Sequence, residues 1–310
     1  MKFTKFFVGA LAVAAMMSCG NGTKKCDSAC ADSACVAVKV ELPIAVQLYS
    51  VRGDMEADFV GTLAKIKGMG YDGVEFAGLF GNAPEQVKHW CDSLGLDAVS
   101  AHVPLADMLA DVDKVIADYK AIGCEYIVVP YVTEERRPNG ELFMQMIEEI
   151  KAIGEKATAA GLTLLYHNHD FEFNKLESGQ PGLDYMYENV PANLLQTELD
   201  VCWVNVGGEE PAPYVRKYAG RAPLLHLKDF TGVKSSNMYN LIGQDAVRDE
   251  SAAKFDYRPV GYGKQDVPAI VAAAEDADVQ WLIVEQDRCS MGRTALECAE
   301  MSVKYLKSFL

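Results

Sequence analysis

The chain has 310 residues and a formal net charge of −15, and hydrophobic residues make up half of its sequence. So acidic a chain should be repelled by nucleic acids and by anionic lipid surfaces, which argues against binding to either. The hydrophobic content is sufficient for a large buried core.

The N-terminus has the pattern of a bacterial lipoprotein export signal. Two lysines precede a short apolar run, residues 6–17, that is too short to span a membrane. Cys19 follows this run, so we expect residues 1–18 to be removed as a signal peptide and Cys19 to carry lipid. An ordinary signal peptide with an incidental cysteine is the alternative. Residues 19–41, rich in small and polar residues, are predicted to form a lipidated flexible tether. This organisation predicts a protein of the cell envelope, on the periplasmic face or the cell surface, whose lipid anchor is its only membrane contact.

From residue 42 onward, apolar strand-like runs alternate with helical patterns, several of which end at glycine. The predicted strands are 44–48, 73–76, 98–102, 126–130, 162–166, 194–199, 224–227 and 281–284. The predicted helices include 58–69, 84–94, 112–122, 141–160, 213–218, 267–275 and 293–310. Eight strands alternating with helices favour a closed (β/α)₈ TIM barrel over residues 42–310. A doubly wound sheet is the alternative, but the first strand lacks the glycine-rich phosphate turn that such folds usually carry.

One connection, residues 230–263, is longer than most strand-to-helix connections. Long connections often cover functional sites, so we expect a partial lid there. A disordered insertion is the alternative.

The most informative segment is LTLLYHNHDFEF, residues 162–173. A buried strand is predicted to end at this histidine pair, and alternation along a strand places His167 and His169 on the same side. Two imidazoles in such a position can bind a metal ion or transfer a proton. A pair of hydrogen-bonded structural histidines is the alternative.

Ionisable residues collect at the ends of the other predicted strands, where TIM barrels carry their active sites. They are Glu75, His102, Glu198, Asp200, His226, Lys228, Asp229 and Glu285. Buried ionisable groups are costly unless they are paired or bind a metal. Four residues from consecutive strands could therefore surround one divalent ion, namely His167, Asp200, His226 and Glu285. Mixed nitrogen and oxygen ligation admits Mn²⁺, Zn²⁺, Co²⁺, Fe²⁺ or Mg²⁺ without distinguishing them, and salt bridges at the barrel rim are the alternative.

The chain resembles the xylose isomerase-like TIM barrels of the sugar phosphate isomerase/epimerase superfamily. The resemblance spans nearly all of residues 42–310 and is carried by YDGVE (71–75), YHNHDFEF (166–173), LDVCW (199–203), LHLKD (225–229), VGYG (260–263) and VEQD (284–287). Many relatives bind a divalent metal through Glu, Asp, His and Glu, and three of these positions match in Asp200, His226 and Glu285. The remaining position is His167, where relatives often have the glutamate of a Glu-x-His arrangement. In epimerases of the superfamily the two glutamates also form the acid/base pair, so this replacement argues against simple two-carboxylate epimerisation.

The resemblance implies an enzyme that removes a proton next to a sugar carbonyl, with a cation stabilising the enediolate. We expect Glu285 and His169 to transfer protons and Lys228 to contact a substrate hydroxyl as a further catalytic group. The expected substrate-binding residues are Glu75, His102, Glu172, Trp203 and Asn168. A structural hydrogen bond is the alternative for Glu172, and a core position is the alternative for Trp203.

Export favours a non-phosphorylated sugar, keto-sugar or glycoside as the partner molecule, because sugar phosphates are mostly intracellular. A 3-keto-glycoside lyase acting by β-elimination is the first alternative, and a non-catalytic sugar-binding lipoprotein is the second. A metal-dependent nuclease on a related barrel would need a basic groove, which so acidic a chain does not suggest. An oligomer is compatible with the sequence.

Overall fold

The computed structural model describes residues 42–234, 238 and 255–310. The predicted signal peptide, tether and lipidated Cys19 lie outside the described residues, and they stay predictions. Most of the predicted lid, residues 235–237 and 239–254, also lies outside them. No helix in the described part of the chain is long and apolar enough to cross a membrane.

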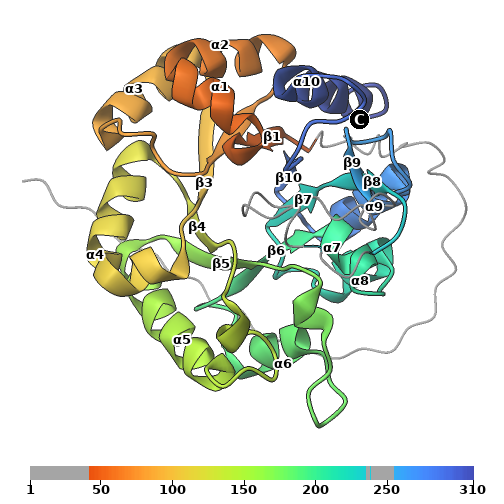
Figure 1. The fold of residues 1–310 in the computed structure, drawn as a ribbon. Coiled ribbons are helices and arrows are strands. Elements are labelled where there is room, and N and C mark those ends of the chain that lie inside the picture. The colour runs from red at the N-terminus through yellow and green to blue at the C-terminus, as the bar shows by residue number, and fades with distance from the viewer. Residues whose placement is uncertain (1–41, 235–237, 239–254) are drawn as a thin grey trace, which may run out of the picture. The chain divides into compact units, whose positions relative to one another are not determined.

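Eight parallel strands close into a barrel, which confirms the predicted TIM-barrel fold (Figure 1). In spatial order they are β1 (Ile44–Gln47), β10 (Trp281–Val284), β7 (Leu224–Leu227), β6 (Gln196–Asp200), β5 (Thr163–His167), β4 (Tyr126–Val129), β3 (Asp97–His102) and β2 (Gly73–Phe76), which pairs with β1. Four of the eight strands, β1, β2, β4 and β7, are buried along their whole length, as expected of parallel strands covered by helices.

Helices surround the strands as a ring (Figure 1). The ring contains α2 (Phe59–Met69), α3 (Pro84–Leu94), α4 (Leu105–Ile122), α5 (Phe143–Ala160), α6 (Gly182–Asn189), α8 (Pro211–Lys217), α9 (Val267–Asp276) and α10 (Ala295–Leu306). Helices α2 to α5 each end at a glycine with positive φ, as predicted. The short helices α1 (Arg52–Ala57) and α7 (Val201–Val206) were not predicted, because they hold too few turns to show a helical period. Helix α6 was not predicted either.

The N-terminal half of the barrel interior is filled by apolar side chains. Its members are Ala45, Val99, Tyr126, Val128, Leu165, Leu224 and Ile283. Side chains at positions i and i+2 of a strand point to the same face. The side chain at i+2 therefore lies next to the one at i, one step closer to the C-terminal end of the strand. Leu165, Leu224 and Ile283 therefore stand directly below His167, His226 and Glu285. The packed apolar layer confines the polar residues to the C-terminal end of the barrel.

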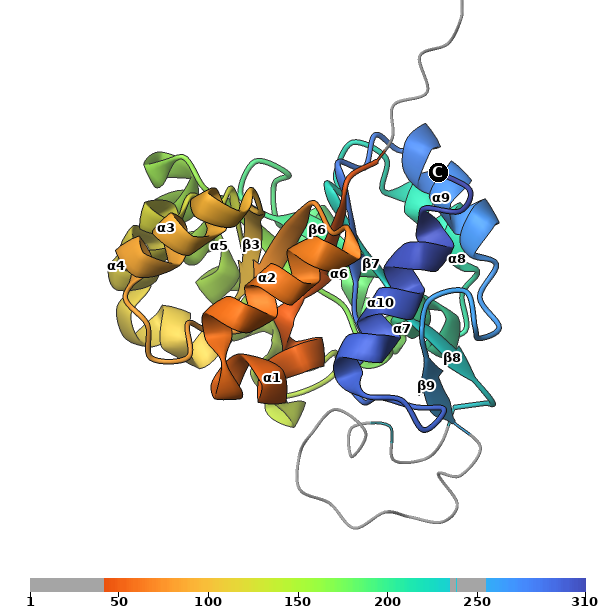
Figure 2. The same ribbon diagram turned by 90° about the horizontal axis from the view of Figure 1, so that it is seen from above.

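A small antiparallel pair, β8 (Asp229–Thr231) and β9 (Asp256–Arg258), lies at the same end of the barrel as α1 (Figure 2). The Asp229 carboxylate fixes the loop after β9 by accepting backbone hydrogen bonds from Gly261 (3.0 Å) and Gly263 (2.9 Å). A Cβ atom on Gly263 would lie 2.1 Å from Asp229 Oδ1, so only glycine fits there. Thus Asp229 connects the LHLKD and VGYG segments structurally.

The described residues also form the 3-10 helices η1 (Leu48–Val51), η2 (Glu134–Arg136) and η3 (Phe171–Phe173).

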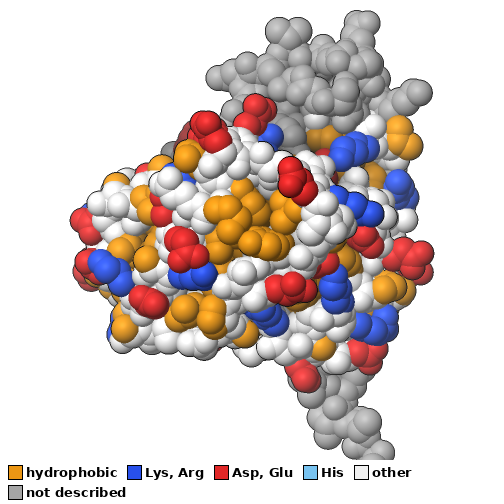
Figure 3. Space-filling view, turned by 90° about the horizontal axis from the view of Figure 1, so that it is seen from below, with side chains coloured by type: hydrophobic (Ala, Val, Ile, Leu, Met, Phe, Trp, Pro, Cys, Tyr) orange, Lys and Arg blue, Asp and Glu red, His pale blue; other side chains and the backbone are white. Residues whose placement is uncertain are grey.

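The outer surface carries no simple charge pattern on the face drawn in Figure 3. Acidic, basic and hydrophobic side chains are interspersed there, and a group of hydrophobic side chains lies near the middle of that face. Such mixing on the helical wall is ordinary for a protein surface. The clustering of ionisable residues described next occurs inside the barrel.

Candidate active site and metal centre

A cavity of about 620 Å³ opens above the apolar layer of the barrel. Its charged wall is formed by residues from three strand ends, namely His167, His169, Lys228, Glu285 and Asp287. The four predicted metal ligands converge here: His167, Asp200, His226 and Glu285 each offer a donor atom within 4.8 Å of the others. All four side chains are buried. The structure therefore brings together all four residues that were predicted as metal ligands from their places at strand ends.

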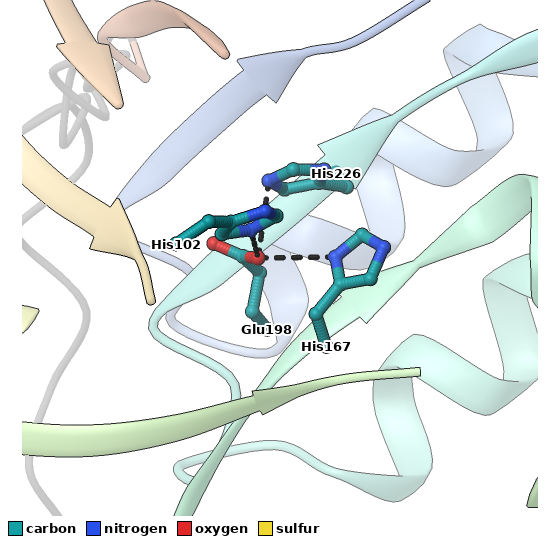
Figure 4. Close-up of side chains that lie close together, drawn as sticks. All are labelled: His102, His167, Glu198 and His226. Atoms are coloured by element: carbon teal, nitrogen blue, oxygen red, sulfur yellow. Dashed lines mark hydrogen bonds and ion pairs between the residues drawn. The ribbon is translucent and has the colours of Figure 1, made fainter. Parts of the chain in front are cut away.

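A second group of donors lies next to the first and shares two of its histidines (Figure 4). Three imidazoles surround the Glu198 carboxylate, with Glu198 Oε2 lying 2.6 Å from His102 Nε2, 3.0 Å from His167 Nδ1 and 3.2 Å from His226 Nε2. The sequence places Glu198 at a strand end, but no role was predicted for it. The available signal was its spacing of two residues from Asp200, which places both carboxylates on one face of β6.

The shared histidines each use their two ring nitrogens differently. His226 Nδ1 lies 3.1 Å from Glu285, while its Nε2 lies 2.7 Å from Glu75. His167 Nε2 lies 3.7 Å from Asp200 Oδ2, on the side opposite its contact with Glu198. Histidines that bind metals usually donate their other ring N–H to a carboxylate, which fixes the ring and its tautomer. Glu75 and Glu198 occupy that supporting position.

Glu75, which was predicted to contact substrate, lies behind the cavity wall rather than on it. Its carboxylate is fully buried and accepts hydrogen bonds from Gln47 (2.7 Å) and Ser100 (2.5 Å), and it is not among the residues that line the cavity. Burial, together with the neighbouring carboxylate of Glu198, raises the pKa of Glu75 to about 7. From this position Glu75 can hold the His226 ring in place.

Lys228 is enclosed by three carboxylates. Its Nζ lies 2.8 Å from Glu285, 3.0 Å from Asp287 and 3.4 Å from Asp200. One ammonium cannot neutralise three buried carboxylates, and burial raises the pKa of Asp200 to about 6. Asp287 was not predicted, although it follows Glu285 by two residues.

This excess of buried negative charge provides a test of whether a cation fits the predicted donor set. Asp200 Oδ2 accepts no hydrogen bond from any described residue, and its ion-pair contacts are long, 3.4 Å to Lys228 Nζ and 3.7 Å to His167 Nε2, although it is buried beside the other three donors. A buried carboxylate oxygen without a hydrogen-bond donor is typical of a metal ligand. Two imidazoles and two carboxylates suit Mn²⁺, Zn²⁺, Co²⁺ or Fe²⁺ better than Mg²⁺, which prefers oxygen donors.

Asn168 does not face the cavity as we expected for a substrate-binding residue. It lies between two histidines on the opposite face of the chain, where its Oδ1 accepts a hydrogen bond from the Asp200 backbone N–H (2.9 Å). Its Nδ2 donates to the Asp200 carbonyl (3.4 Å). Asn168 thus joins the end of β5 to the end of β6 and holds the Asp200 backbone in place.

Glu172 also differs from the expected substrate contact and fulfils the structural alternative. It accepts hydrogen bonds from the Tyr166 hydroxyl (2.6 Å) and the His169 backbone N–H (2.8 Å), and it does not line the cavity. These contacts close the turn that carries His169. Burial raises the pKa of Glu172 to about 8.

Trp203 likewise lies in the core rather than on the cavity wall, as its alternative predicted. It is fully buried and packs with Phe230, Phe255 and Tyr257. Its backbone N–H donates to Asp200 Oδ1 (2.9 Å), so the start of α7 holds one carboxylate oxygen and leaves the other toward the donor group. Of the five predicted substrate-binding residues, only His102 lines the cavity.

Two residues of the charged wall are unprotonated at neutral pH. Burial, reinforced by His167 and Lys228, lowers the pKa of His169 well below its usual range, so its imidazole is neutral. Burial alone would raise the pKa of Glu285, but Lys228 and His226 lower it well below the usual range. The His169 ring is held against Phe171, with centroids 5.4 Å apart and planes 1° from parallel.

The pH dependence of stability should reveal the buried Glu172. Its folded pKa of about 8 exceeds the ordinary 4.5, so the stability it contributes is complete below pH 4.5 and is lost as the pH rises toward 8. We expect Glu172→Gln to reduce the loss of unfolding free energy over this range by about 4 kcal/mol, measured by urea denaturation. The matched control, Glu188→Gln at an exposed site on α6, should leave the slope unchanged. Equal slopes for wild type and Glu172→Gln would contradict the buried, protonated state.

A closed (β/α)₈ barrel whose ionisable residues gather at the C-terminal ends of its strands has the architecture of a TIM-barrel enzyme. The model of the xylose isomerase-like TIM barrel family matches residues 63–308, and the chain belongs to this family. No sequence among the curated proteins matches it significantly. The family assignment confirms the resemblance seen in the sequence.

Solved structures of low sequence identity share the fold. A sugar phosphate isomerase/epimerase from Parabacteroides distasonis is 21% identical with a TM-score of 0.69, over 88% of this chain and 96% of that one. An L-ribulose 3-epimerase is 17% identical with a TM-score of 0.63, over 86% and 94% of the two chains. A 3-keto-D-glucoside 4-epimerase from E. coli is 15% identical with a TM-score of 0.62, over 86% and 100%. At these identities the likeness establishes the fold.

Proposed function

We propose that this protein is a metal-dependent enzyme of the sugar isomerase/epimerase type, which removes a proton next to the carbonyl of a non-phosphorylated sugar or keto-sugar. The observation that carries the proposal is the convergence of four metal donors within 4.8 Å of one another, beside a cavity that His169 and Glu285 line. Family membership and the isomerases and epimerases among the similar structures support it.

His167, Asp200, His226 and Glu285 would hold the ion. When bound, the ion would supply positive charge that stabilises an enediolate oxygen and orients the substrate. In the metal-free protein, burial would lower the pKa of His226, but Glu198 and Glu75 raise it well above the usual range. His226 must therefore lose a proton to become a ligand, so metal binding should release protons and weaken at low pH.

Proton transfer falls to residues of this chain that face the cavity. His169 is the better candidate for the first base, because its imidazole is neutral and it is not one of the four donors. Glu285 is ionised and can take or return a proton at a neighbouring position. Lys228 keeps its proton, since Asp287 and Glu285 outweigh burial and raise its pKa well above the usual range. Its ammonium would donate a hydrogen bond to a substrate oxygen.

The charges of the cavity support a neutral substrate. Among the described residues that line it, Lys228 is the only lysine or arginine, and it already contacts three carboxylates, while His102 lies against the Glu198 carboxylate. A phosphate group would find little positive charge to bind there. Together with the export predicted from the N-terminus, this favours a sugar without phosphate and a location in the cell envelope.

The test is to incubate the metal-loaded protein in D₂O with ketoses, 3-keto-glycosides and sugar phosphates, and to follow each carbon-bound proton by NMR. We expect deuterium to enter at a carbon next to the carbonyl of a non-phosphorylated substrate. Release of the aglycone along with exchange would identify the β-eliminating lyase instead of the epimerase. Sugar binding without any exchange would contradict the proposal and leave a sugar-binding protein.

A further inference from the structure

The walls of the cavity differ in chemistry between the two halves of the barrel. The wall that follows β5, β7 and β10 carries the charged residues of the candidate metal centre. The opposite wall follows β1 to β4 and α4, and it is mainly apolar, formed by Tyr49, Ala77, Val103, Pro104, Pro130 and Tyr131 among others. Asp107 is the carboxylate on this second wall, and His102 stands at its border with the first. A bound molecule would therefore meet charge on one side and rings or methyl groups on the other.

The cavity is also larger than one sugar ring requires. At about 620 Å³ it lies in the middle of the range for pockets that enclose drug-sized ligands, roughly 300–1,000 Å³. The proposed reaction confines the reacting sugar to the charged wall, because the metal donors and both proton-transfer residues are there. The space along the apolar wall is then left for another part of the same substrate.

The second part of the substrate should be apolar and ring-shaped. Pro104 and Pro130 offer no backbone N–H, and the side chains of Ala77 and Val103 are methyl groups, so a second sugar would find few hydrogen-bond partners there beyond Asp107 and the tyrosine hydroxyls. Tyr131 offers an aromatic ring and connects the two walls, since its centroid lies 5.3 Å from that of His169 at an interplanar angle of 83°. A ring bound against Tyr131 would thus lie next to a sugar bound at His169.

We propose that the wall after β1 to β4 is a subsite for an apolar aromatic aglycone, so that the substrates are keto-glycosides with an aryl aglycone rather than free monosaccharides. This inference rests on the proposed function for the position of the sugar. It requires no group beyond those already described, because the aglycone binds and does not react at this wall.

The experiment compares matched phenyl and methyl β-glycosides of glucose, galactose and xylose, with dissociation constants measured by calorimetry on the metal-loaded full chain. Within at least one pair, the phenyl glycoside should bind about tenfold or more tightly, since its ring leaves water at the apolar wall. Ala77→Asp places a carboxylate in that wall and should reduce the preference to about twofold or less. The matched control is Ala152→Asp at an exposed position on α5, which should keep the wild-type preference.

Each other outcome separates this inference from the proposed function. Equal affinities within every pair would overturn the subsite, as would tighter binding of cellobiose than of phenyl glucoside. Deuterium exchange with free ketoses but no binding of any glycoside would also overturn the subsite while leaving the proposed function intact. The protein could also prefer phenyl glycosides, lose this preference in Ala77→Asp, and exchange deuterium into no substrate. That result would support the subsite and contradict the proposed function.

Discussion

Replacing Glu285 by Gln is expected to lower the rate of deuterium exchange into substrate by about a thousandfold. The substitution keeps the size of the side chain and removes a carboxylate that lies 3.1 Å from His226 and 2.8 Å from Lys228. Both proposed roles of Glu285, metal donor and proton-transfer group, depend on that charge. The measurement is the initial exchange rate at saturating metal, monitored by NMR.

Glu148→Gln provides the matched control for this variant. Glu148 is an exposed residue of α5 that pairs with Lys151, so the substitution removes one negative charge far from the cavity lining. It should retain the wild-type rate. An exchange rate for Glu285→Gln within about threefold of wild type would remove Glu285 from the mechanism.

Replacing Lys228 by Met is expected to destabilise the metal-free protein by about 3–5 kcal/mol. The variant leaves three buried carboxylates without the ammonium that lies within 3.4 Å of each of them. Urea denaturation measures the change in unfolding free energy. The loss should become smaller at low pH, because protonated carboxyl groups no longer require a counter-ion, and it should also become smaller when a divalent metal is added.

Lys304→Met is the control for the loss of a lysine. Lys304 pairs with Glu300 on the exposed surface of α10, where an ion pair contributes roughly 0–1 kcal/mol. Unfolding free energies that fall equally in both variants would show that the cluster around Lys228 is not the source of the stability. A loss of unfolding free energy for Lys228→Met that changes with neither metal nor pH would show that the loss does not come from the three carboxylates.

The strands of the fold follow closely from the sequence. Three predicted strands, 73–76, 224–227 and 281–284, have the observed bounds, because parallel strands buried on both faces appear as continuous apolar runs. The glycine at the end of each helix from α2 to α5 fixed where the next strand begins. The antiparallel pair β8 and β9 was missed, because its strands have three residues each and are separated by a long connection.

The four metal donors could be predicted because strand periodicity and barrel topology act together. Each donor lies near the C-terminal end of a strand or directly after it, and the parallel arrangement carries all the C-terminal ends to one side. The depth of a side chain could not be predicted in this way. Glu75 pairs in register with Ser100 rather than with His102, so the stagger of the strands places it one layer below the cavity. The register between strands depends on the closed barrel, so it cannot be predicted from the sequence of either strand alone.

The residues of the β5 turn show a second limit. Alternation along the chain does place Asn168 opposite its two histidine neighbours, but its contact with the Asp200 backbone depends on the end of β6. The inward position of Glu172 depends on the 3-10 turn η3, which returns the chain toward Tyr166. Both residues were predicted to bind substrate, and neither of these contacts follows from the strand pattern alone.

Metal dependence of the exchange reaction is the most direct test of the proposed chemistry. The protein would be stripped of metal with a chelator, dialysed, and assayed for deuterium exchange before and after addition of Mn²⁺, Zn²⁺ or Co²⁺. We expect exchange to fall by at least about a hundredfold on stripping and to return with one ion bound per chain, and we expect Asp200→Asn to weaken that binding. Full exchange activity in the metal-free protein would contradict a role for the metal held by His167, Asp200, His226 and Glu285.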